Sequence, residues 1–126
     1  MNIILKHLKQ LGLFKKTKFV ILYGSVAQGK ATPLSDIDVC ISLALPPAQR
    51  FKARVKLLGE LPEKYDIHIF EDLPLYVQKE VFAGKILYCQ NKDELVQRAL
   101  VLIREYEDFE PIYEYYISQR GAEAIS

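Results

Sequence analysis

The chain has 126 residues, of which half are apolar and a quarter are charged. This size and composition are those of a globular domain with a substantial core, and they exclude a disordered or fibrous chain. The net charge is only +1, so the chain as a whole does not favour nucleic acid or a membrane surface as a partner, and any polyanion site must be local.

Targeting and redox signals predict a cytoplasmic protein. The N-terminal stretch has no continuous apolar segment of the signal-peptide kind, because charged and polar residues interrupt it between Lys6 and Gln10. No run approaches the length of a membrane span, which is about 18 apolar residues. Cys40 and Cys89 lie in apolar stretches without a disulfide spacing pattern, so we expect buried free thiols in a reducing compartment.

Periodicity and turn residues predict helices and strands in alternation. Strands are expected at 18–24, 36–43, 65–70 and 85–89. Helices are expected at 2–11, 25–30, 46–58, 74–84 and 92–108, with a last one from Pro111 onward. The alternation predicts an α/β fold.

The sequence predicts a single domain over residues 1–126, with a core of about 1–90 and a helical C-terminal extension of about 91–120. One side of the helix at 46–58 carries apolar residues that we expect to face the core: Phe51, Val55 and Leu58. The extension carries an aromatic stripe that either packs against the sheet or forms an association surface: Tyr106, Phe109, Tyr113 and Tyr116.

The strand at 36–43 carries two aspartates, although Asp is rare in strands. Side chains two residues apart in a strand point the same way, with Cα atoms about 6.5–7 Å apart, so Asp36 and Asp38 converge on one side of the sheet. Two ionised carboxylates at this range repel each other, and a bound Mg²⁺ or Mn²⁺ relieves the repulsion. The alternative is a sheet edge whose polar face is simply hydrated.

A Gly-Ser pair precedes these aspartates by one loop. Gly24 ends a strand and Ser25 begins a short helix, so free backbone N–H groups there can bind a phosphate. An ordinary strand-to-helix turn capped by serine has the same sequence. If the strands are adjacent, the turn and the carboxylate pair come together, and a nucleoside triphosphate with Mg²⁺ is the natural ligand of such a site.

Residues 24–39, GSVAQGKATPLSDIDV, resemble the G-S-x-A-x-G…S-D-[IL]-D-[LV] signature of the DNA polymerase beta-like nucleotidyltransferases, and most of all the minimal nucleotidyltransferases (MNT) of bacteria and archaea. The resemblance implies a small mixed β-sheet of three to four strands with helices packed mainly on one face. It also implies nucleotidyl transfer from a triphosphate, with Asp36 and Asp38 as catalytic metal ligands and with Gly24 and Ser25 binding the nucleotide.

The family's third carboxylate is expected on a neighbouring strand, where it binds metal and helps to deprotonate the acceptor hydroxyl. Asp66 fits this role because it lies in the middle of the apolar alternating segment YDIHIF. Glu63, Glu71 and Asp72 are rivals, but they lie at segment ends, where solvated carboxylates are ordinary. For His68, which shares a face with Asp66, a position at the edge of the site or on the surface is favoured over a supporting role.

Three carboxylates, Asp36, Asp38 and Asp66, suit a scheme with two divalent ions, Mg²⁺ or Mn²⁺, and with ATP as the substrate. One ion accompanies the triphosphate, and the other activates a hydroxyl that attacks the α-phosphorus and expels pyrophosphate. Gln28 occupies a position where many family members have arginine, which removes one charge near the phosphates. Activity is still expected.

Larger relatives carry an extra domain that binds the acceptor, and no such domain is evident here. The acceptor is therefore expected to be small, held by the helical extension, or brought by another polypeptide. Minimal nucleotidyltransferases often pair with a helical HEPN-domain protein, a toxin RNase, so the resemblance implies an antitoxin that attaches AMP to such a partner. The alternatives are a non-catalytic antitoxin acting by contact and, less favoured, an adenylyltransferase of the aminoglycoside type. The oligomeric state stays open, a homo-oligomer included.

Overall fold

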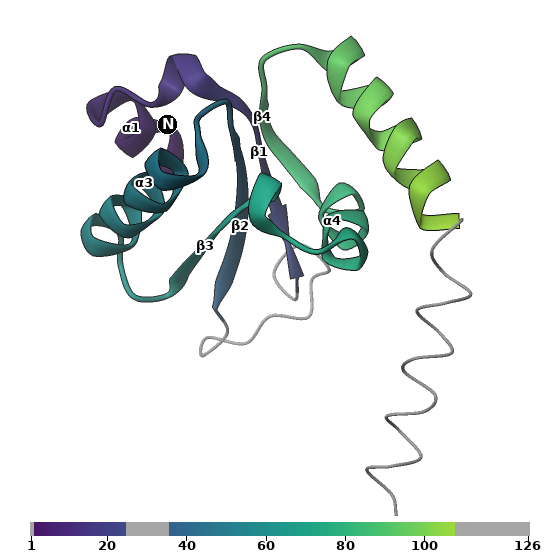
Figure 1. Ribbon diagram of the computed structural model, residues 1–126. Coiled ribbons are helices and arrows are strands. Elements are labelled where there is room, and N and C mark those ends of the chain that lie inside the picture. Colours follow the sequence, from purple (N-terminus) through teal and green to yellow (C-terminus); the bar gives the residue numbers. More distant parts are fainter. Residues whose placement is uncertain (1, 25–35, 108–126) are drawn as a thin grey trace, which may run out of the picture.

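The computed structural model describes residues 2–24 and 36–107. They form a four-stranded mixed sheet in the order β3-β2-β1-β4 that is flanked by helices (Figure 1). The α/β fold class and the small mixed sheet expected from the sequence are confirmed. The helix expected at 25–30 and the one expected from Pro111 onward lie outside the described residues.

Each predicted strand is present, within one or two residues of its expected bounds: β1 is Thr17–Tyr23, β2 is Ile37–Leu43, β3 is Tyr65–Ile69 and β4 is Lys85–Cys89. The apolar β1 pairs antiparallel with both β2 and β4, whereas β3 runs parallel to β2 at the edge of the sheet. Parallel pairing needs a long crossover, which the intervening helix provides. Cys40 in β2 and Cys89 in β4 are free thiols, as predicted; the first is fully buried and the second is half-buried.

The predicted helices within the described residues are also present: α1 is Ile3–Gln10, α3 is Pro47–Glu60, α4 is Leu75–Phe82, and a further helix covers 92–107. Two short 3₁₀ turns are added, η1 at Phe14–Lys16 and η2 at Phe70–Asp72. The Asn2 side chain caps α1 by accepting a hydrogen bond from the Ile4 amide at 2.8 Å. Within the described ranges, none of these helices has the length and apolarity that crossing a bilayer demands.

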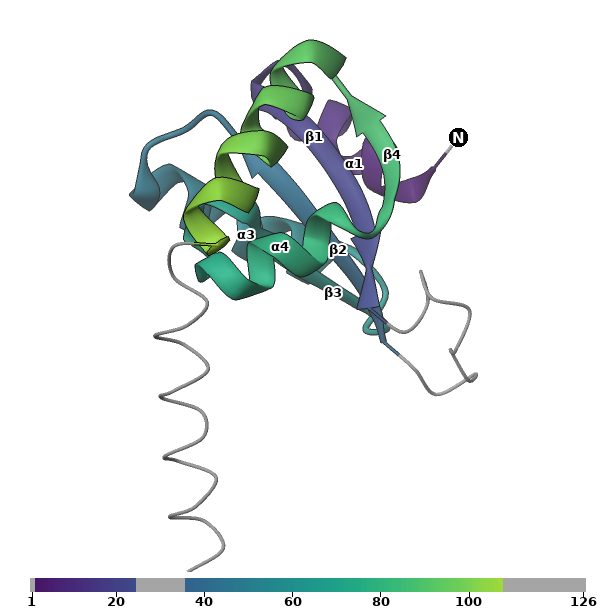
Figure 2. The same cartoon turned by 90° about the vertical axis from the view of Figure 1, so that its right-hand side faces the viewer.

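Helices cover both faces of the sheet, which corrects the expectation that they pack mainly on one (Figures 1 and 2). On the aliphatic face, α1 and α3 bury a core that includes Ile4, Leu8, Val20, Val39, Ile41, Leu57, Ile67 and Ile69. On the aromatic face, α4 and the helix at 92–107 bury a second core: Phe19, Ile21, Tyr23, Cys40, Phe70, Val81, Leu95 and Leu102. The reason is that the central strand β1 carries apolar residues on both of its sides, so both faces must be covered.

Helix α3 buries the stripe opposite to the one that the sequence suggested. Ala53 and Leu57 are buried, whereas Phe51 is 64% exposed and Val55 is 51% exposed. A step of two residues rotates a helix by about 200°, so both stripes are periodic and only packing against the sheet decides between them. Ala53 belongs to the buried core beneath α3, and Phe51 lies on the side of the helix turned away from it. Leu58 is partly buried against the core, as expected.

A polar network ties the helix at 92–107 to β2 on the aromatic face. Ser42 is fully buried; its Oγ donates to Glu71 Oε2 at 2.5 Å and accepts from Arg98 Nη1 at 3.1 Å. Glu71 Oε1 also accepts from the Leu43 amide at 3.0 Å. The Arg98 guanidinium lies 4.9 Å from the centre of the Phe70 ring. The network therefore gives each of these polar side chains a partner and fixes the helix against the sheet.

Candidate active site

Two aspartates from neighbouring strands face each other on the aromatic side of the sheet. Asp38 of β2 is in register with Asp66 of β3, and on its other side with Tyr23 at the end of β1. Because residues paired across strands point to the same side, the three side chains form a row that crosses three strands. The structure thus places Asp66 beside Asp38, as the sequence suggested.

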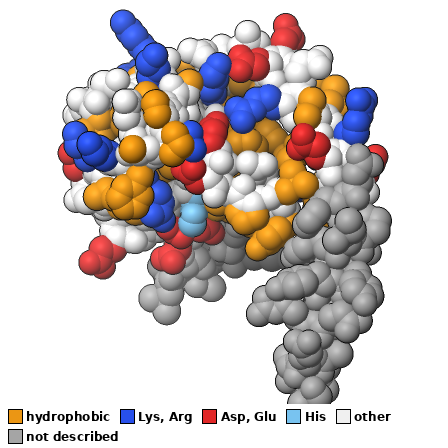
Figure 3. Space-filling view, in the orientation of Figure 1, with side chains coloured by type: hydrophobic (Ala, Val, Ile, Leu, Met, Phe, Trp, Pro, Cys, Tyr) orange, Lys and Arg blue, Asp and Glu red, His pale blue; other side chains and the backbone are white. Residues whose placement is uncertain are grey.

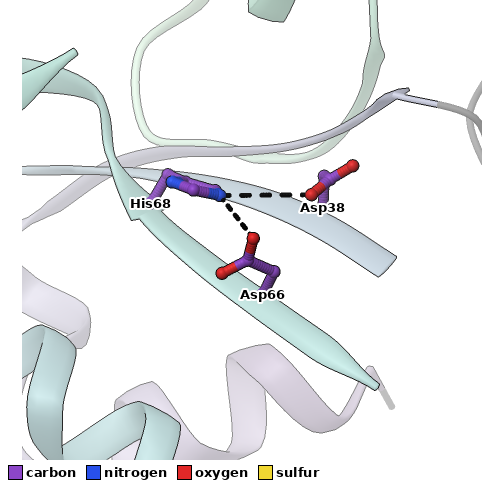
Figure 4. A group of neighbouring side chains, drawn as sticks. All are labelled: Asp38, Asp66 and His68. Atoms are coloured by element: carbon purple, nitrogen blue, oxygen red, sulfur yellow. Dashed lines mark hydrogen bonds and ion pairs between the residues drawn. The ribbon is translucent and has the colours of Figure 1, made fainter. Parts of the chain in front are cut away.

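His68 completes a compact group with these two carboxylates (Figure 4). Its Nε2 atom lies 2.9 Å from Asp66 Oδ2 and 4.0 Å from Asp38 Oδ1, and its ring stands 6.0 Å from that of Tyr23. The sequence favoured an edge or surface position for this histidine, and the structure instead places it against both carboxylates. Its spacing of two from Asp66 was the signal, since that spacing puts both side chains on one face of a strand.

Gly24 lies directly against Asp38. Its φ of 78° is in the left-handed region that favours glycine, and a Cβ built there would overlap the Asp38 carboxylate. The glycine is therefore required both by the backbone conformation and by the close approach of the turn to the carboxylate. Ser25, the other residue predicted to bind the nucleotide, lies outside the described residues.

Asp36 is placed differently from the other two predicted ligands. It lies exposed directly before β2, and the group of candidate metal ligands among the described residues consists of Asp38, Asp66 and His68 without it. Asp36 is nevertheless close enough for its charge to raise the pKa of Asp38. Its assignment as a ligand stays a prediction.

The electrostatics of the site disfavour a bare pair of carboxylates. Burial raises the pKa of Asp38; the neighbouring charge of Asp66 raises it further, and His68 lowers it. Burial also raises the pKa of the Tyr23 phenol, and the surrounding negative groups add to this effect, so the phenol stays protonated at neutral pH. Negative charge therefore accumulates at the row, and a cation bound there would stabilise it.

The rival carboxylates have other partners or lie apart. Glu71 belongs to the network with Ser42 and Arg98, and Asp72 accepts hydrogen bonds from the Arg50 guanidinium, the shortest at 2.8 Å. Glu63 is exposed before β3 begins. Of the four candidates for a third carboxylate, Asp66 is the one that the register sets opposite Asp38.

The donor set fits a divalent cation. One oxygen from Asp38, one from Asp66 and a ring nitrogen of His68 all lie within 4.8 Å of one another. Carboxylate oxygens suit Mg²⁺, and an imidazole beside them is also accepted by Mn²⁺ and other transition ions. The raised pKa of Asp38 points the same way, because burial and the neighbouring charge of Asp66 both disfavour a bare carboxylate there, and a bound cation would offset both effects.

A mixed sheet with a close glycine turn at the end of one strand and facing carboxylates on the next two has the architecture of a nucleotidyltransferase. Residues 6–93 match the polymerase beta nucleotidyltransferase family, and the chain belongs to that family. The match includes all four strands and every site residue described above.

Individual relatives agree with this assignment. Over 91 residues the chain is 35% identical to a Methanocaldococcus jannaschii protein named as protein adenylyltransferase MJ1547, a match that covers 72% of this chain and 70% of that one. A chain of a toxin-antitoxin crystal structure with AMP-PNP has a TM-score of 0.72 and 24% identity, covering 92% of this chain and 94% of its own. A chain from a complex of tri-AMPylated Shewanella oneidensis HEPN toxin with MNT antitoxin has a TM-score of 0.62 and 21% identity, covering 92% and 96%. The last two similarities show a shared fold.

Proposed function

We propose that this nucleotidyltransferase is an MNT-type antitoxin that transfers AMP from ATP to a hydroxyl group of a HEPN-domain partner protein and so silences it. The observation that carries the proposal is the register pair of Asp38 and Asp66, which places two carboxylates of adjacent strands on one side of the sheet. The relatives support it: one is named as a protein adenylyltransferase, and the similar structures include an AMP-PNP complex and an AMPylated HEPN toxin with its antitoxin.

In this proposal the triphosphate binds at the turn that contains Gly24 and Ser25. Backbone N–H groups at the start of a helix bind phosphate oxygens, and a glycine lets a phosphate approach the main chain. Because Gly24 is in contact distance of Asp38, phosphates held by this turn lie beside the carboxylates. The reacting α-phosphorus is thus held at the row of acidic side chains.

Divalent cations, Mg²⁺ or Mn²⁺, would be held by Asp38 and Asp66, with Asp36 as a further ligand. They would neutralise the triphosphate charge and make the acceptor hydroxyl more acidic. The protein's own contribution is orientation. His68 Nε2 lies 2.9 Å from Asp66 Oδ2, and this contact holds the carboxylate toward Asp38.

The transfer forms one bond and breaks one bond. The acceptor oxygen bonds to the α-phosphorus while the bond from that phosphorus to the bridging oxygen of pyrophosphate breaks, and pyrophosphate leaves with the electron pair. The hydroxyl proton passes to the Asp66 carboxylate, which the contact with His68 holds in place. The products are the AMP ester of the acceptor and pyrophosphate.

The test uses ATP labelled in the α-phosphate, Mg²⁺ and the HEPN-domain partner, with label on the partner as the readout. We expect Asp38→Asn and Asp66→Asn each to lower the transfer rate by about 100-fold or more, because each removes a carboxylate that would hold the cation neutralising the reacting phosphates. Asp93→Asn removes an exposed aspartate of the helix at 92–107 and is the matched control, with no change expected.

The same experiment separates the enzyme from an antitoxin that acts by contact alone. If the wild-type protein labels nothing, and if an Asp36→Asn/Asp38→Asn double variant still neutralises the toxin, the enzymatic proposal is wrong. Label that appears on the partner and is lost with chelation of divalent ions supports both the transfer and its metal dependence.

A further inference from the structure

A groove of about 360 Å³ lies between α3 and β3, directly beside the proposed active site. Its lining comes mostly from α3 and from residues in and after β3: Pro47, Phe51, Arg54, His68 and Leu73. His68 belongs to both places: it lines the groove, and its Nε2 lies 2.9 Å from Asp66 Oδ2, so the groove and the carboxylates share one residue. On the face shown in Figure 3, hydrophobic and basic side chains gather around a histidine, with acidic side chains next to it.

The two substrates of the transfer approach the carboxylates from opposite ends of the row. Gly24 is against Asp38, so the triphosphate lies on the β1 side. Asp66 is on β3, which has no strand beyond it within the described part of the sheet. Attack in line requires the acceptor oxygen and the leaving pyrophosphate to stand on opposite sides of the α-phosphorus. The acceptor therefore arrives from the β3 side, where the groove lies.

The groove offers an apolar anchor to an incoming protein segment. Phe51 is 64% exposed, and Val55, one turn further along α3, is 51% exposed. Exposed aromatic side chains beside a pocket are typical of the residues that dominate protein interfaces. Arg54 Nε donates a hydrogen bond to the Ile67 carbonyl at 2.7 Å. The Arg54 side chain thereby occupies one backbone hydrogen-bonding position on the open edge of β3. This carbonyl is therefore not free to pair with an added strand, which favours binding of a segment through its side chains.

We infer that this groove binds the segment of the partner protein that carries the acceptor hydroxyl. Phe51 packs against an apolar side chain of that segment, a few residues away from the hydroxyl that reacts at Asp66. The inference rests on the proposed function and names the surface that selects the partner. Phe51 determines specificity and takes no part in the chemistry, because the reacting atoms lie beyond His68.

The first test compares Phe51→Ala with Ile86→Ala, in the full-length protein with its intact partner. Ile86 is 52% exposed and lies on β4, the opposite edge strand, so both changes remove an exposed apolar side chain. We expect Phe51→Ala to raise the KM for the partner protein by about tenfold or more, the value of burying one large apolar side chain. The KM for ATP should stay within about twofold of the wild type in both variants.

A second test places the photo-crosslinker p-benzoylphenylalanine at position 51 or at position 86. On irradiation with the partner, position 51 should crosslink to the partner segment that receives AMP, and position 86 should not. If the wild type transfers no AMP, the proposed function is wrong, yet a crosslink from position 51 still identifies the groove as the partner-binding surface.

Two results would overturn the inference. A Phe51→Ala variant with a raised KM for ATP and an unchanged KM for the partner would show that the groove holds the nucleobase. A crosslink to the partner from position 86 and none from position 51 would place the partner on the other edge of the sheet.

Discussion

The two faces of the sheet differ although the same two strands contribute to both. Toward the aliphatic face, β2 and β3 direct buried apolar side chains: Val39, Ile41, Ile67 and Ile69. Toward the aromatic face, they direct polar ones: Asp38, Ser42, Asp66 and His68. Because alternate residues of a strand point to opposite sides, this strand pair contributes only core packing on the aliphatic face, whereas on the aromatic face it carries Asp38, Asp66 and His68 of the candidate site as well as the structural Ser42. Packing and chemistry are therefore expected to separate in variants.

The largest effect on stability should come from the aliphatic face. Leu57→Ala removes a fully buried side chain where α3 meets the sheet and should lower the free energy of unfolding by about 2–5 kcal/mol. Phe51→Ala, on the exposed side of the same helix, should change it by less than about 0.5 kcal/mol. Urea denaturation measures both. A larger loss from Phe51→Ala than from Leu57→Ala would mean that α3 packs with the other stripe inward.

Gly24→Ala should lower both activity and stability, with the larger effect on activity. The new Cβ would displace the Asp38 carboxylate, and a shift of about 1 Å in a catalytic group costs about 100-fold in rate, equal to about 2.7 kcal/mol. The left-handed backbone adds a stability loss of about 1–2 kcal/mol. Gly59→Ala in α3 is the control, because a Cβ there meets no atom within 4 Å among the described residues and alanine favours the helix. An active Gly24→Ala protein would remove the proposed link between the turn and Asp38.

The polar network should show a smaller effect, on the stability of the aromatic face. Arg98→Met removes the donor to Ser42 and the partner of Glu71, and we expect a loss of about 1–2 kcal/mol because the Arg98 side chain is one-third exposed. Arg104→Met, an exposed change on the same helix, should be neutral. Thermal denaturation measures the melting temperatures of the two variants. Equal melting temperatures would show that the network does not hold the helix against the sheet.

The smallest effect should be the pH dependence that Asp38 imposes on stability. Its pKa in the folded protein is raised above the ordinary 3.8, so its contribution to stability is full below pH 3.8 and is lost as the pH rises through the folded value. Without divalent ions, Asp38→Asn should therefore unfold at a slightly higher denaturant concentration than the wild type at pH 7, and the difference should vanish below pH 3.8. A difference that is the same at both pH values would contradict this assignment, and Asp93→Asn serves as the neutral control.

Much of this site could be predicted from local pattern. Asp38 and Asp66 stand out because a carboxylate is anomalous in the middle of an apolar alternating segment. The pairing of β2 with β3 could not be predicted in this way. The two strands are separated by α3, and their register follows from long-range packing. The sequence therefore singles out Asp38 and Asp66 as candidates, and the fold shows that the two side chains meet.

The features that were missed depend on long-range contacts. The exposed side of α3 could not be chosen from periodicity, since Phe51 and Leu57 belong to equally regular stripes. The second helical layer follows from Leu95 and Leu102, which look like any apolar residues of an amphipathic helix. The hydrogen bond between Ser42 and Arg98 could not be predicted from local sequence, because the two residues are 56 positions apart.

The hydrogen bond from Arg54 to the Ile67 carbonyl has a consequence for solubility. Edge strands with unpaired backbone groups recruit strands from other molecules and seed aggregates. On β3 a guanidinium fills one of those positions, and on the opposite edge β4 begins with the exposed Lys85, whose charge discourages pairing. The edge beside the carboxylates can thus stay open to a partner's side chains at high protein concentration, without two copies of the sheet joining into one.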